Sequence, residues 1–209
     1  MAKELMPVIR DDLSDRLVHL TKGDNPLSTF VRILADRALL GGTGFIKGKH
    51  RCVCFSEAPI SKLPQILSTP HQNVKYRPYG FVFTKKWVFG KGGRPVIYQP
   101  DSDYADLPRS KRHLHVRFWL SDKYSVDHTW EREWRIKTDR LDFTPDDVTL
   151  LIPTRIVSDG LKEDWAVQHA TTGSAERYPW HHIVLEDLGI KIPDYVPDAG
   201  ASAASSTDS

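Results

Sequence analysis

The chain has 209 residues, enough for a substantial core, and no shift in composition divides it into two domains. Its 29 lysines and arginines nearly balance 27 aspartates and glutamates, so any attraction to nucleic acid must come from a local patch. The sequence lacks an apolar run of the ~20 residues that a membrane span needs, and MAKELMPVIRDD lacks the apolar core of a secretory signal. We expect one cytoplasmic domain over residues 1–192 that makes no membrane contact.

The first predicted elements are a strand, a helix and a glycine loop. LVHLTK (17–22) is a short β-prone run, and the polar residues after it are candidate helix caps before Pro26, which suits a first helical turn. Apolar residues then recur at helical spacing until Gly41 and Gly42 interrupt the pattern. The sequence therefore predicts a helix over residues 26–40.

The rest of the chain is dominated by predicted strands, which are RCVCFSE (51–57), YGFVFTK (79–85), PVIYQ (95–99), HVRFWL (115–120), EWRIK (133–137) and VTLLIP (148–153). Further helices are expected only near residues 60–67 and at 162–171. This pattern predicts an α+β fold with few helices and mixed, largely antiparallel sheets. From Pro193 onward the chain has almost nothing to bury, which predicts a disordered tail over residues 193–209.

The two cysteines, Cys52 and Cys54, lie two residues apart on a predicted strand, where an extended backbone disfavours a disulfide between them. We expect two free thiols. The sequence has no second cysteine pair and no histidines at zinc-site spacing, and the adjacent His181 and His182 point apart in regular structure. We therefore expect no metal site.

One dense basic segment, LPRSKRHLHVR (107–117), stands out from the balanced charge of the chain. Arg109, Lys111 and Arg112 are its candidate nucleic-acid contacts. A solvated loop is the alternative, and it is favoured because one short patch is weak evidence for nucleic-acid binding.

The segment WEREWRI (130–136) places Glu131 and Glu133 two residues apart. On a strand both carboxylates would emerge on one face although their charges repel each other. His19, Arg51 and Glu133 lie on three predicted strands far apart in sequence, and a cleft between two sheets would bring such a polar triplet together.

The order of these motifs resembles the ADP-ribosyltransferase superfamily. A His-x-Thr strand (His19 and Thr21) is followed by a helix, by Arg51 at the start of a strand, and by Glu-x-Glu on a late strand. VHLTKGDN with the following helix is similar to the opening of DarT-like DNA ADP-ribosyltransferase toxins. The stretch from CVCFSEAPI to WEREWRI resembles a bacterial abortive-infection family often labelled AbiGi.

This resemblance implies that NAD is the substrate and that each matched residue has a role. Glu133 would stabilise positive charge on the ribose as the bond to nicotinamide breaks, and Glu131 would orient or deprotonate the acceptor. His19 and Thr21 would line the NAD site, and Arg51 would bind the diphosphate. Three aromatic residues are candidates to stack on nicotinamide, namely Tyr79, Phe83 and Tyr98.

Each of these residues also has a structural interpretation. His19 could be a satisfied core histidine, and Arg51 could form an ordinary ion pair with Glu57 or Glu133. Glu131 and Glu133 could belong to an exposed edge ladder that resists aggregation.

Three functions remain open from the sequence. The first is an NAD-dependent ADP-ribosyltransferase that acts as a toxin or anti-phage effector on a nucleic-acid or protein acceptor, with a possible cognate antitoxin or defence partner. The second is a catalytically inactive binding module of an abortive-infection system, either a phage sensor or an antitoxin-type partner. The third is a metal-dependent nuclease.

Overall fold

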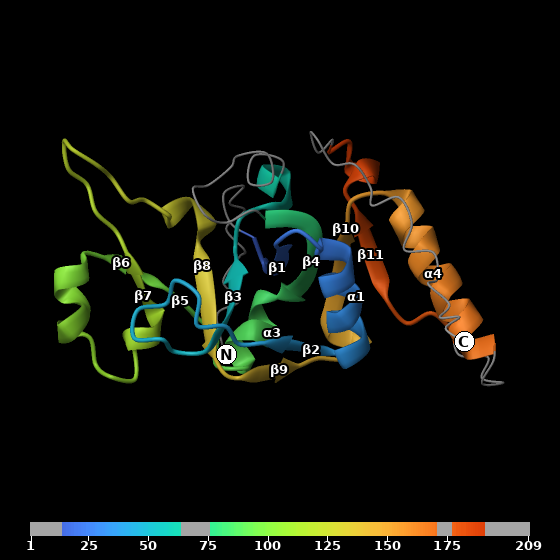
Figure 1. Ribbon diagram of the computed structural model, residues 1–209, viewed down its shortest axis with the longest axis horizontal. Helices are drawn as coiled ribbons and strands as arrows, with labels where there is room; N and C mark the ends of the chain where they lie inside the picture. The colour runs from blue at the N-terminus through green and yellow to red at the C-terminus, as the bar shows by residue number, and fades with distance from the viewer. Residues whose placement is uncertain (1–13, 64–75, 171–176, 191–209) are drawn as a thin grey trace, which may run out of the picture.

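The computed structural model describes residues 14–63, 76–170 and 177–190. Its main sheet has seven strands in the order β11-β10-β4-β1-β3-β8-β5 (Figure 1). These strands are β1 (Arg16–Lys22), β3 (Cys52–Ser56), β4 (Tyr76–Thr84), β5 (Arg94–Pro95), β8 (Glu133–Lys137), β10 (Val148–Ile152) and β11 (His181–Val184). Neighbouring strands are antiparallel except β10 and β11, which are parallel. The predicted α+β class with a mixed, largely antiparallel sheet is confirmed.

Two small sheets lie beside the main one. In the first, β2 (Ala38–Leu40) pairs antiparallel with β9 (Arg140–Asp142), and in the second, β6 (Ile97–Gln99) pairs parallel with β7 (His115–Arg117). The α-helices of the described residues are α1 (Pro26–Asp36), α3 (Lys85–Gly90) and α4 (Arg155–Ala170). Short 3₁₀ turns complete the described elements: η1 (Ile60–Lys62), η2 (Asp101–Asp106), η3 (Arg112–Leu114), η4 (Thr129–Glu131), η5 (Pro145–Asp147) and η6 (Glu186–Leu188).

The main sheet is buried on both faces because its central strands carry apolar side chains in both directions. On one face Phe81 and Phe83 of β4 pack with Phe30 of α1 and Val88 of α3. On the other face a smaller cluster surrounds Val82. The η2, η3, β6 and β7 segments form a lobe at the left-hand side of Figure 1, which we call the β6–β7 lobe.

Several predicted boundaries differ from the structure. The first helix ends at Asp36 rather than residue 40, because Arg37 adopts a left-handed conformation (φ 46°) and the next three residues form β2. The last helix begins at Arg155, seven residues before its predicted start at 162. The α3 helix was not predicted, although the Thr84 side chain caps it by accepting the Trp87 N–H at 3.1 Å.

Some expectations fall outside the described residues, among them the tail at 193–209 and the end of the helix expected near 60–67. No helix in the described ranges combines the length and apolar character that crossing a membrane requires.

Candidate functional site

The candidate site centres on Glu133, the first residue of β8, which lies opposite Ser56 of β3. Arg135 binds both oxygens of the Glu133 carboxylate, with 2.8 Å from Nε to Oε1 and 2.9 Å from Nη2 to Oε2. Its remaining donor, Nη1, reaches the backbone carbonyls of His113 and His115, each at 2.9 Å. Because Arg135 is only 5% exposed, this fork fixes the orientation of Glu133.

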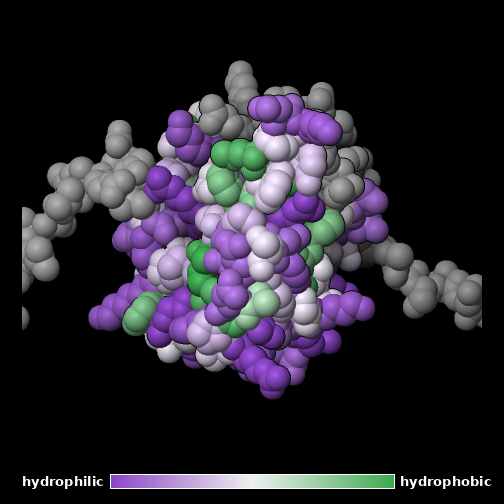
Figure 2. All heavy atoms as spheres, turned by 90° about the vertical axis from the view of Figure 1, so that its left-hand side faces the viewer, coloured by the Kyte–Doolittle hydropathy of each residue, from purple (hydrophilic) through white to green (hydrophobic). Residues whose placement is uncertain are grey.

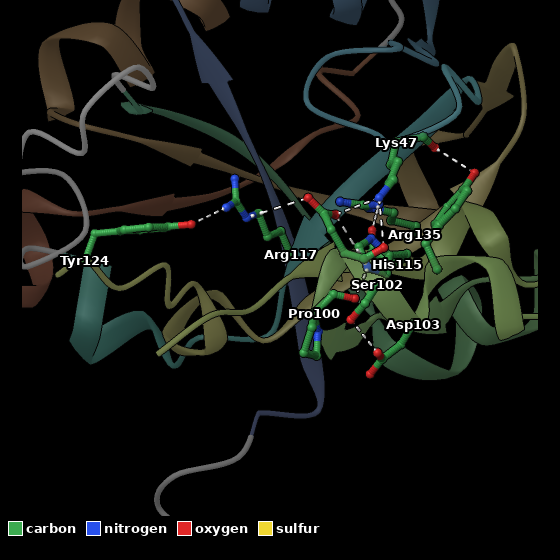
Figure 3. A network of polar contacts seen from close by, with 10 residues as sticks. Lys47, Pro100, Ser102, Asp103, His115, Arg117, Tyr124 and Arg135 are labelled. Atoms are coloured by element: carbon green, nitrogen blue, oxygen red, sulfur yellow. Dashed lines mark hydrogen bonds and ion pairs between the residues drawn. The ribbon is translucent and has the colours of Figure 1, made fainter. Parts of the chain in front are cut away.

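The same arginine ties Glu133 to the β6–β7 lobe. Figure 3 shows Arg135 beside His115 and the polar residues of this lobe. The imidazole of His115 lies 3.3 Å from the Pro100 carbonyl and 3.9 Å from an Asp101 carboxylate oxygen. Lys47 pairs with the same Asp101 oxygen at 3.0 Å. A continuous set of polar contacts therefore runs from the site into the lobe.

Glu131 lies in η4, one turn before the strand, and Arg132 between the two glutamates has a positive φ of 44°. The Oε2 atom of Glu131 accepts a hydrogen bond from the Tyr76 hydroxyl at 3.2 Å. Burial, followed by the negative charge of Glu133, raises the pKa of the Glu131 carboxyl. A carboxylate with a raised pKa is a stronger base than that of an ordinary glutamate, which suits it to accept a proton.

Two tyrosines border the carboxylates. The Tyr98 hydroxyl accepts the backbone N–H of Glu133 at 3.0 Å, and burial raises the pKa of Tyr98 to about 12. Burial, with the charge of Glu131, also raises the pKa of Tyr76. Both phenols are therefore protonated at neutral pH. The ammonium group of Lys22 lies 4.8 Å from the centre of the Tyr76 ring.

His19 lies where β1 separates from β3, since these strands share a single registered pair, Val18 with Ser56. Its Nδ1 is 2.8 Å from the Cys54 carbonyl. A carbonyl only accepts, so Nδ1 carries the proton and Nε2 is left as an acceptor. Burial lowers the pKa of His19 to about 4, and the ring is neutral at pH 7.

Cys54 makes hydrogen bonds to both His19 and Glu133. Its carbonyl accepts from His19, while its thiol hydrogen-bonds to Glu133. Burial, then the charge of Glu133, raises the pKa of the thiol. Cys52 and Cys54 are both free, as predicted.

Arg51 lies away from these groups. It is exposed before β3 and pairs with Asp139 at 3.0 Å, so its partner is neither Glu57 nor Glu133. Five residues of extended chain separate it from Ser56, which lies opposite Glu133, or about 17 Å. The predicted diphosphate role does not fit this position.

Three other predicted site residues belong to the interior. Thr21 is 3% exposed and donates to the Tyr79 carbonyl at 3.1 Å. Tyr79 and Phe83 are 1% and 0% exposed within the core, so neither presents a ring face to a ligand. Of the predicted stacking residues, Tyr98 alone lies at the site.

The basic segment at 107–117 is more ordered than a solvated loop. Arg109 and Lys111 are exposed, but Arg112 donates to the carbonyls of Leu107 at 3.1 Å and Ala105 at 2.9 Å. His113 and His115 of the same segment are buried.

Sequence reasoning missed Arg135, Tyr76 and Lys22. The position of Arg135, two residues after Glu133 on a predicted strand, was the available signal, because such residues share a face. No group of three or more histidine, cysteine, aspartate or glutamate residues that could hold a metal ion occurs among the residues the structure describes. No protein-family model, curated protein or solved structure matches the chain.

Proposed function

We propose that the protein is an NAD-dependent ADP-ribosyltransferase that acts as a toxin or anti-phage effector. One observation carries the proposal: Glu131 and Glu133 lie close together in different surroundings. Glu131 has a raised pKa and contacts a tyrosine, whereas both oxygens of Glu133 are bound by an arginine. Pairs of carboxylates in contrasting environments are typical of chemistry at a sugar carbon, where one handles a proton and the other stabilises charge.

In this mechanism the bond between the ribose C1′ and the nicotinamide nitrogen breaks, and nicotinamide leaves with the bonding electrons. Glu133 stabilises the positive charge that develops on the ribose. Glu131 takes the proton from the acceptor as its nucleophilic atom attacks C1′. The acceptor is a nucleic-acid base or a protein side chain, and water gives NAD hydrolysis instead.

Other residues would hold the substrate. The Nε2 atom of His19 can accept a hydrogen bond from a ribose hydroxyl, because its Nδ1 is committed to the Cys54 carbonyl. The positive charge of Lys22 acts on both His19 and Glu131, so Lys22 is our candidate for the diphosphate in place of Arg51. Tyr98 supplies an aromatic ring beside Glu133.

The test is incubation of the purified protein with labelled NAD and a panel of nucleic acids and lysate proteins. Glu133→Gln should lower both transfer and NAD hydrolysis by at least about 100-fold, because a charge aimed at the transition state is removed. Glu131→Gln should suppress transfer and spare slow hydrolysis. Glu163→Gln, on the exposed face of α4, is the matched control. A wild-type protein that neither binds nor consumes NAD would refute the proposal.

The Arg135 fork also supports a second candidate, a catalytically inactive binding module of an abortive-infection system. The Glu133 side chain is 12% exposed and both its oxygens are already bound, as in a purely structural ion pair. In that case cells carrying Glu133→Gln would keep full phage protection. Loss of protection together with loss of NAD turnover would favour the enzyme.

A further inference from the structure

A second cluster of titratable side chains lies at the other end of β8, away from Glu133. The loop between β2 and β3 turns sharply at Gly48 (φ 79°) and Lys49 (φ 51°) and brings His50 against His113 of η3. The two imidazole rings are nearly perpendicular, with centroids 6.3 Å apart. Lys47 fastens this loop to the β6–β7 lobe through Asp101.

Each of these histidines has a buried ring nitrogen without a hydrogen-bond partner. The atoms are Nε2 of His50 and Nδ1 of His113. Buried polar atoms are normally paired, so two unpaired nitrogens on neighbouring rings require an explanation. The His113 residue is 9% exposed.

The charges that act on this pair are positive. Burial, then Lys137 and Arg112, lower the pKa of His50. Burial, then Lys137, also lowers the pKa of His113, with smaller contributions from His50, Arg135 and Lys111. Asp139, two residues after Lys137, is paired with Arg51, and Asp101 of η2 is paired with Lys47.

We propose that His50, His113 and Lys137 form a binding site for an oxyanion of the phosphate class. One phosphate can accept a hydrogen bond from each unpaired ring nitrogen and from the exposed ammonium of Lys137. A single oxygen bonded to both rings needs their centroids within about 8 Å, a limit that the observed separation meets. Arg112 adds positive charge while its own donors hold the Leu107 and Ala105 carbonyls.

The surface around the cluster suits a charged ligand. Figure 2 shows this side of the molecule as largely hydrophilic, with apolar side chains in small separate patches. The phosphate could belong to a free phosphate compound or to a nucleic-acid backbone, and the basic residues Arg109 and Lys111 of the same segment are exposed. The site is independent of the proposed reaction with NAD.

The experiment measures thermal stabilisation of the full chain by inorganic phosphate, against sodium chloride at equal ionic strength. Phosphate should raise the melting temperature in a saturable way. In Lys137→Gln the half-saturating concentration should rise at least about tenfold, as expected for loss of one charge-assisted hydrogen bond. Lys123→Gln, which changes an exposed lysine in the segment between β7 and η4, should bind phosphate as the wild type does.

Phosphate that stabilises no more than chloride, or that binds Lys137→Gln as tightly as wild type, would overturn the proposal. His50→Gln and His113→Gln should also weaken binding, and the imidazole ¹⁵N signals of the wild type should shift with phosphate if either variant fails to fold. A labelled single-stranded oligonucleotide separates the two sources. If phosphate displaces the oligonucleotide and Lys137→Gln weakens oligonucleotide binding, the result supports the site with nucleic acid as its ligand. If phosphate binds and the oligonucleotide does not, the result supports the site with a small phosphate compound as its ligand.

Discussion

Removing the ammonium group of Lys85 should lower the free energy of unfolding, because the buried Glu57 carboxylate then loses its ion-pair partner. Lys85 Nζ lies 2.5 Å from Oε1 of Glu57, whose side chain is 10% exposed. The other Glu57 oxygen accepts the indole N–H of Trp134 at 2.8 Å. In Lys85→Met the Glu57 carboxylate would keep this neutral donor but lose its charged one while remaining buried.

Breaking a buried ion pair by removing one partner costs about 3–5 kcal/mol. The Lys85 side chain is 30% exposed, so water can partly replace the ammonium, and we expect the lower end, about 3 kcal/mol. For a chain of this length that corresponds to a fall in melting temperature of roughly 6–12 °C. Glu57→Gln combined with Lys85→Met should recover most of the loss, because glutamine removes the charge but still accepts from Trp134.

Urea unfolding at pH 7 measures these free energies. Lys86→Met is the matched control, because Lys86 is the next residue of α3 and is exposed. If Lys85→Met and Lys86→Met differ by less than about 0.5 kcal/mol, the Glu57 carboxylate does not depend on Lys85 and the reasoning fails.

Two further perturbations test the fold. The folded state favours neutral His19, with a pKa near 4 against an ordinary 6.5, so this stabilisation is complete above pH 6.5 and is lost as the pH falls toward 4. Between pH 7 and pH 5 the wild type should lose about 2 kcal/mol more unfolding free energy than His19→Gln, and equal losses in urea titrations would contradict the assignment. A Cβ at Gly41 would lie 1.9 Å from the Thr138 carbonyl oxygen, whereas one at Gly42 would meet no atom within 4 Å. Gly41→Ala should therefore cost at least about 2 kcal/mol and Gly42→Ala under about 0.5 kcal/mol by the same assay, and similar costs would show that the backbone relaxes around position 41.

The order of motifs in the sequence pointed to Glu131 and Glu133 but not to the arginine that binds Glu133. Glu131 and Glu133 are adjacent in a short motif, so their proximity follows from local spacing. The basic residue that binds Glu133 is Arg135 rather than Arg51, and Arg135 is held by carbonyls 22 and 20 residues earlier in the chain. Such contacts depend on how η3 and β7 pack against β8, which strand periodicity does not report.

The aromatic residues illustrate a second limit. Tyr79 and Phe83 lie on β4, and β4 sits between β10 and β1 with both faces covered. A continuous apolar run identifies such a strand, but it does not distinguish an aromatic ring in the core from one facing a cleft. Tyr98, on a short strand outside the main sheet, is the one that reaches Glu133.

The single registered pair between β1 and β3 has a consequence for motion. Six registered pairs join β1 to β4 and five join β3 to β8, so the main sheet consists of two well-bonded blocks with a weak seam between them. Regions with few backbone hydrogen bonds open at lower free energy than the elements that flank them. We expect amide hydrogens along this seam to exchange with solvent earlier than those of β4 and β8. We also expect the hydrogen bond from His19 to the Cys54 carbonyl, which crosses the seam, to help hold the two blocks together.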